Sequence, residues 1–112
     1  MAGPSLTTKM TLQSAVRSPD GAGGYAELWS DMGVLWGALE RPRGSKIAGQ
    51  EIPISRHRYR IIVRSAPEGA PSRPEVAQRF VFDGRAFHIQ GVTHEDSGRR
   101  FLACDVEEEL VG

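Results

Sequence analysis

The sequence contains a single cysteine, Cys104, which excludes an intramolecular disulfide and any metal site built from clustered cysteines. It has no apolar run near the ~20 residues that a membrane-spanning helix needs. The N-terminus has no continuous apolar segment like that of a signal peptide. Sustained helical periodicity is lacking as well. These absences favour synthesis in a reducing cytoplasm, no membrane partner and a mostly β structure.

An excess of charge is also missing. Lys and Arg together number 14, as do Asp and Glu, so no overall field attracts nucleic acid or an anionic membrane. The charges are nevertheless unevenly placed. Seven basic residues and one acidic residue lie between Arg41 and Arg64, whereas the C-terminus carries an acidic tail of Asp105, Glu107, Glu108 and Glu109. We expect these opposite patches either to meet between neighbouring copies, head to tail, or simply to face solvent.

What is present is a series of short alternating segments. A chain of 112 residues suits one compact domain over 1–112, of which residues 1–6 are expected to form a flexible N-terminal arm. Lys9 to Val16 predicts a strand with Met10, Leu12 and Val16 on one side. A glycine-rich turn follows at 18–24, and it lacks the Gly-Lys-Ser/Thr that a phosphate-binding loop requires.

The next region predicts two strand segments, Tyr25 to Trp29 and Val34 to Arg41, broken near Ser30 and Asp31. Alternation places Val34, Trp36 and Ala38 on one face. We expect both tryptophans to anchor the core, because buried indoles are commoner than base-stacking platforms and no basic residue is interleaved with these two.

Residues 41–53 hold two prolines and two glycines without a sustained period, which predicts a long loop. A short helical turn around 45–50 is the alternative for its centre. Loops of this length in a small domain are usually functional or become ordered against a partner.

The clearest strand runs from Ile54 to Arg64. One face carries His57, Tyr59, Ile61 and Val63, and the opposite face carries Ile62 with four arginines: Arg56, Arg58, Arg60 and Arg64. Four arginines cannot all be buried without partners, so this basic face is predicted to meet solvent, an acidic neighbour or DNA phosphates.

Two hairpins complete the chain after a proline-rich surface insertion at 67–74. Asp83-Gly84 between alternating apolar runs predicts a two-residue turn that brings Phe80 and Phe82 against Phe87 and Ile89. A second turn at 95–98 leads into a strand over 99–107. The predicted fold is therefore a small antiparallel β-barrel or sandwich of about six strands, with a long loop between the second and third major strands.

No constellation of residues predicts catalysis or a cofactor. The histidines His57, His88 and His94 lack a catalytic or metal-ligand spacing. Cys104 lies among apolar strand positions, where a thiol serves as packing. A Ser45–Lys46 pair would need a rigid, desolvated lysine, which a loop does not provide.

The order and spacing of these elements resemble the phage head–tail joining family, the head-closure or stopper proteins. The similarity runs nearly end to end, and five segments carry it: 20–25, 27–29, 35–40, 57–64 and 82–92. The proline-rich insertion departs from the family pattern, because it is longer than expected there. A phage, a prophage or a gene transfer agent would use the same part.

The resemblance implies a non-enzymatic virion protein, made in the bacterial cytoplasm, that forms a ring of six or twelve copies below the portal and adaptor. Such a ring closes the head over packaged double-stranded DNA and docks the tail terminator and tail tube. The loop would face the channel or a neighbouring subunit through Arg41, Arg43, Ser45, Lys46, Ile47, Gln50 and Glu51. Phosphate contacts need only positive charge, without base-specific geometry.

Three other interpretations remain open at this point. The protein could be another connector component, a tail terminator or an adaptor, although an adaptor should show long helices. From a different class, it could be a small-barrel protein that binds single-stranded nucleic acid through Arg56 to Arg64 and Tyr59. A small hydrolase would need an acid–base pair that the sequence does not offer.

Overall fold

The computed structural model describes residues 5–41, 45–47, 50–52 and 57–109. Within them the chain forms eight strands and no helix, and so no helix that could cross a membrane. In chain order the strands are β1 (Thr8–Pro19), β2 (Tyr25–Glu40), β3 (Ser45–Ile47), β4 (Gln50–Ile52), β5 (Arg58–Arg64), β6 (Arg79–Phe82), β7 (Arg85–His94) and β8 (Phe101–Glu108).

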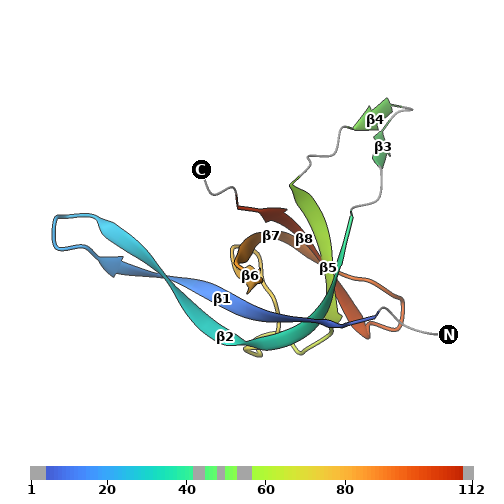
Figure 1. The fold of residues 1–112 in the computed structure, drawn as a ribbon, viewed down its shortest axis with the longest axis horizontal. Helices are drawn as coiled ribbons and strands as arrows, with labels where there is room; N and C mark the ends of the chain where they lie inside the picture. Colours follow the sequence, from blue (N-terminus) through green and yellow to red (C-terminus); the bar gives the residue numbers. More distant parts are fainter. Residues whose placement is uncertain (1–4, 42–44, 48–49, 53–56, 110–112) are drawn as a thin grey trace.

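Six of the strands form one antiparallel sheet that closes on itself in the order β1-β2-β5-β8-β7-β6 (Figure 1). The seam is the pairing of β1 with β6, over Thr11–Gln13 and Arg79–Val81. This arrangement confirms the predicted mostly β fold of six strands and decides between its two forms, a closed barrel and a sandwich, in favour of closure. Each of the six strands therefore has a neighbouring strand on both sides over part of its length.

The core follows the two-residue period of the strands. Every second side chain points inward, and the buried set is Met10, Leu12, Ile61, Val63, Phe80, Phe87, Ile89, Leu102, Cys104 and Val106. Asp83 and Gly84 both have positive φ, which a two-residue hairpin turn of this kind requires. That turn pairs Phe80 with Phe87 and stacks Phe82 on Phe87 at 5.0 Å between ring centroids, which confirms the predicted aromatic cluster.

A second, smaller cluster covers the outer side of β5 and β8. Ile62, Phe101 and Ala103 are buried there under Leu6 and Ala38. Leu6 belongs to the predicted N-terminal arm, whose residues 1–4 lie outside the described part. The proline-rich segment after β5 is exposed over 67–69 and 71–72, as a surface insertion should be, but Pro74 is fully buried.

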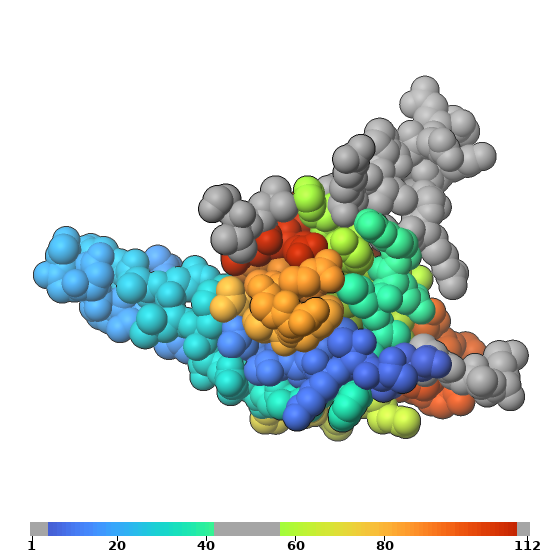
Figure 2. Space-filling view, in the orientation of Figure 1, coloured from blue at the N-terminus to red at the C-terminus, as the bar shows by residue number. Residues whose placement is uncertain are grey.

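The first two strands are longer than the barrel needs. Beyond the seam, β1 and β2 continue together as a two-stranded ribbon, the arm, which comprises residues 14–31 (Figure 1). Figure 2 shows it projecting from the rounded body. At its tip the Asp20 carboxylate accepts hydrogen bonds from the backbone N–H groups of Ala22 and Gly24, which confirms the predicted turn.

The predicted break near Ser30 and Asp31 is wrong, because β2 is one continuous strand of 16 residues. The register with β1 shifts between Leu12 and Gln13, where β2 carries one extra residue, Met32, between Asp31 and Gly33. A bulge of this kind absorbs one residue without ending the strand.

The prediction that both tryptophans anchor the core is also wrong. Trp36 is 55% exposed and Val34 is 51% exposed, because the inward positions of β2 within the barrel are Leu35, Gly37 and Leu39. Trp29 lies on the arm and is half-buried against side chains of the barrel's outer surface. Val16, expected beside Met10 and Leu12, is 49% exposed because β1 has left the barrel by that point.

The connection from β2 to β5 is long, as predicted, but it is not without structure of its own. Residues 45–47 and 50–52 pair as the antiparallel strands β3 and β4, so the alternative of a helical turn at 45–50 is wrong. The two apolar β-branched residues Ile47 and Ile52 fit short strands. Arg43 and residues 53–56, including Ile54 and Arg56 of the predicted strand, lie outside the described residues.

Candidate functional site

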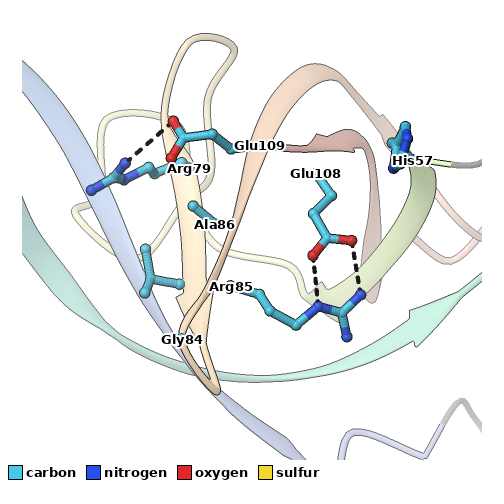
Figure 3. A pocket seen from close by; sticks show the side chains of 8 residues that line it. His57, Arg79, Gly84, Arg85, Ala86, Glu108 and Glu109 are labelled. Atoms are coloured by element: carbon cyan, nitrogen blue, oxygen red, sulfur yellow. Dashed lines mark hydrogen bonds and ion pairs between the residues drawn. The ribbon is translucent and has the colours of Figure 1, made fainter. Parts of the chain in front are cut away.

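A charged and aromatic cluster lies at the end of the barrel where β2 ends and β5 begins. Arg85 donates two hydrogen bonds to the carboxylate of Glu108, at 2.8 Å from Nε and 2.9 Å from Nη2 (Figure 3). Its guanidinium lies 4.9 Å from the ring centroid of Phe87 and 5.7 Å from that of Tyr59. The Arg85 side chain therefore covers the aromatic end of the core while its charge is matched.

This pairing shifts both titrations. The hydrogen bonds from Arg85 lower the pKa of Glu108, and the carboxylate in turn raises the pKa of Arg85. Arg41 also lies over the Tyr59 ring, 4.7 Å from its centroid. A pocket of about 560 Å³ opens beside the Arg85–Glu108 pair. It is lined by residues from β6, β7 and the end of β8 together with His57 (Figure 3).

A second network ties the arm to the outer surface of the barrel. Arg79 on β6 donates to the Gln13 side chain at 2.7 Å and lies 4.1 Å from the Trp29 ring centroid. His88, paired with Arg79 across the hairpin, packs edge-to-face with Trp29 and lies 2.9 Å from Glu109. These contacts fix the root of the arm against β6 and β7.

The acidic tail is largely engaged within the chain. Glu108 is held by Arg85, Glu109 lies near Arg79 and His88, and Glu107 accepts a hydrogen bond from Gln90 at 2.7 Å. Only Asp105, exposed on β8, has no such hydrogen bond or ion pair within the described residues. A contact of this tail with a neighbouring copy remains a prediction, and these internal pairs would compete with it.

The predicted basic face of β5 is present over the residues that the structure describes. Arg58 and Arg64 are exposed, and Arg60 forms an ion pair with Glu95. Arg56 lies outside the described residues. The face is thus less uniformly basic than the sequence indicates, because one of its arginines is neutralised by the β7–β8 turn.

The predicted loop residues are spread over three places. Arg41 is exposed at the end of β2, Ser45, Lys46 and Ile47 form β3, and Gln50 and Glu51 belong to β4. In the described part of the chain, β3 and β4 pair with each other and with no strand of the barrel. The hairpin consequently stands off the closed sheet (Figure 1).

Sequence reasoning missed how many apolar side chains of β1 and β2 are exposed. Among the residues whose exposure the structure describes, five of the six exposed large hydrophobic ones lie on β1 and β2: Val16, Tyr25, Leu28, Val34 and Trp36. Along the arm, each strand pairs on one side only within the described part of the chain, so each has a backbone edge that no other described strand covers. The length of the two alternating runs, joined by one glycine-rich turn, was the available signal.

The sequence could also have located the Arg79–His88 pair, because a two-residue turn at Asp83-Gly84 places these residues opposite each other.

The chemistry of Cys104 follows from its packing. Burial raises the pKa of its thiol to about 12, so it is not a nucleophile near neutral pH. Among the described residues, no three His, Cys, Asp or Glu side chains gather as metal ligands.

Comparison with known proteins gives two kinds of match. The family described as phage head completion protein matches residues 1–109. A chain from the virion of a native gene transfer agent particle is 34% identical, with a TM-score of 0.75, over 98% of this chain and 100% of that one. Protein SF1141 from Shigella flexneri 2a, 20% identical with a TM-score of 0.65 and 96% of each chain covered, shares the fold. No curated protein matches.

Proposed function

Because this chain belongs to the phage head completion protein family, and so to the structural proteins of the virion's head–tail connector, we propose that it is the stopper subunit of that connector. In this role several copies form a ring below the portal and adaptor, close the head over double-stranded DNA and carry the tail. The work is binding, and the barrel is a rigid scaffold for the surfaces that bind.

The arm is the observation that carries this proposal. A two-stranded ribbon is marginally stable in water, and an exposed strand edge invites pairing with another chain. The β2 edge over residues 25–36 contains no Lys or Arg to discourage such pairing. A protein keeps so apolar and open a surface when a partner covers it.

The geometry of the arm suits a ring. A ring of identical subunits needs two different surfaces on each copy, one for each neighbour. The two free edges of the arm lie on opposite sides of the ribbon, one on β1 and one on β2. One edge can therefore face the preceding subunit while the other faces the next.

The hairpin of β3 and β4 supplies the gate in this proposal. It stands off the barrel and follows Arg41, and Lys46 lies on β3. The paired strands are themselves balanced in charge, because Lys46 lies opposite Glu51. In this proposal Arg41 and Arg43, which precede the hairpin, therefore present the positive charge to DNA in the channel of the ring. Arg41 itself lies over the Tyr59 ring of the cluster at the barrel end.

Electron microscopy of particles tests the role. Cells that lack the gene should produce heads that leak their DNA and carry no tails. A Val16→Lys/Leu28→Lys variant should reproduce this defect, because it places charge on the apolar surface of the arm. Val76→Lys is the matched control, since Val76 is 59% exposed outside the arm.

The outcomes separate the alternatives. Normal, tailed, DNA-filled particles without the gene would overturn the proposal. Heads that keep their DNA but lack tails would indicate a tail terminator. Tailed, DNA-filled particles of the Val16→Lys/Leu28→Lys variant would show that the apolar side chains of the arm are not needed for the connector.

A further inference from the structure

The end of the barrel opposite the β3–β4 hairpin carries a second charged surface, formed where β5 ends and the turn from β7 to β8 passes beneath it. A shallow groove of about 630 Å³ lies there. Arg64, Arg73, Arg99, Arg100 and His94 line it, together with one acidic residue, Glu68. These arginines are far apart in the sequence and come together only in the fold.

Three of the four guanidinium groups contact an aromatic ring or a backbone carbonyl. Those of Arg64 and Arg100 lie 5.8 and 5.6 Å from the centroid of the same Phe101 ring. Arg73 donates to the backbone carbonyl of Ala66 at 2.9 Å. The positive charges are thus positioned before any ligand arrives, which lowers the entropy cost of binding.

Most of this charge is not neutralised inside the chain. Arg100 pairs with Asp96 at 3.0 Å, but the described residues contain no ion pair for Arg64, Arg73 or Arg99. Arg99 is exposed at a left-handed position of the turn, with φ of 57°. Like charges crowded in one groove repel one another unless an anion lies between them.

We propose that this groove binds the phosphate backbone of double-stranded DNA, at a site separate from the β3–β4 hairpin. The proposal rests on the proposed connector function for its biological setting, although the binding itself belongs to the isolated chain. Arginine forms bidentate hydrogen bonds with phosphate, and such contacts need no base-specific geometry.

The lining favours DNA over an acidic protein partner. Protein interfaces are centred on buried apolar or aromatic anchors, and the apolar lining of this groove is limited to Ala66 and Pro67. A shallow, open groove can also accommodate a DNA duplex that passes across the surface. In a ring, each copy would contribute one such groove, so weak single sites would add along the same DNA.

Fluorescence anisotropy with a short labelled DNA duplex at low salt tests the site. The full chain should bind with an affinity that falls as salt rises. Arg64→Glu/Arg99→Glu should weaken binding by roughly tenfold or more and reduce the slope of log affinity against log salt by about 2. Both residues are exposed and lack internal ion pairs among the described residues, so the variant should fold.

Two further variants make the result specific. Arg17→Glu, on the arm, is the matched control for the kind of charge change and should cause a smaller loss. Arg58→Glu tests the other end of β5, and an equal or larger loss there would overturn the proposal by moving the contact to that face. An absence of duplex binding, tighter binding of single strands, or stronger competition by polyglutamate than by unlabelled duplex would also overturn it.

The particle assay distinguishes this proposal from the connector role. Arg64→Glu/Arg99→Glu particles should keep their tails and lose DNA retention, whereas arm variants should lose assembly with duplex binding unchanged. If gene deletion has no effect on particles but the chain still binds duplex DNA through these arginines, the proposed connector role is wrong and the DNA-binding groove is supported.

Discussion

The barrel and the arm are built from the same two strands, yet they follow different rules. Within the barrel, Met10 and Leu12 are buried and each strand has neighbours on both sides. A few residues further along, Val16 and Leu28 are about half exposed and each strand has one neighbour. Whether a side chain of these strands is buried therefore depends on the number of neighbouring strands at that point. The barrel provides stability and the arm provides a surface, and substitutions should separate the two.

The largest expected difference concerns aromatic packing. Phe87→Ala removes a fully buried ring that contacts Phe82 and Tyr59, and it should lower the free energy of unfolding by about 3–5 kcal/mol. Leu28→Ala on the arm should change it by less than about 0.5 kcal/mol. Urea denaturation of both variants measures this. Equal losses would mean that the arm contributes to the cooperative core.

A smaller difference should appear at the two hairpin turns. Gly84 and Gly21 both have positive φ, 72° and 82°, and at neither position would an added methyl group meet another atom within 4 Å. Alanine therefore adds only backbone strain, about 1 kcal/mol at either site. Gly84→Ala should lower the global stability by that amount, because its turn joins two barrel strands.

Gly21→Ala should leave global unfolding almost unchanged and accelerate amide hydrogen exchange in the arm, since the tip can open while the barrel stays folded. A drop in global stability as large as that of Gly84→Ala would show that arm and barrel unfold together.

The smallest effect is a pH dependence confined to the barrel. Arg85 lowers the pKa of Glu108, so the pair stabilises the fold above the ordinary glutamate pKa of about 4.3 and this contribution is lost as pH falls through the lowered value. When the pH is lowered from about 5 to about 3, the free energy of unfolding of Glu108→Gln should therefore fall less than that of the wild type.

The difference should stay below about 1 kcal/mol, because Arg85 is 37% exposed and solvent screens the pair. Thermal melts across that window measure it. Arg85→Met should flatten the same part of the profile, and an unchanged profile in both variants would contradict the assignment.

Sequence reasoning reached the local elements and failed where partners lie far apart. The hairpin around Asp83-Gly84 and the alternation of Tyr59 to Val63 were readable because turn chemistry and period act over a few residues. The exposure of Trp36 was not, since alternation shows that two faces exist without showing which one closes over the core.

The same limit applies to the surfaces. Nothing local marks the point at which β1 and β2 leave the barrel, because that depends on β6 pairing with only three residues of β1. The arginine groove was invisible for a similar reason. Arg64, Arg73, Arg99 and Arg100 come from three separate segments, and only the closed sheet brings them to one end.

The lone cysteine has a practical consequence. Cys104 is fully buried and its thiol stays protonated near neutral pH, so thiol-reactive reagents should leave the folded chain unmodified. A cysteine introduced at an exposed position such as Ala22 would then be the single labelling site for a fluorophore or a cross-linker. In the native sequence, conversely, the rate at which Cys104 reacts becomes a clock for the opening of the barrel itself.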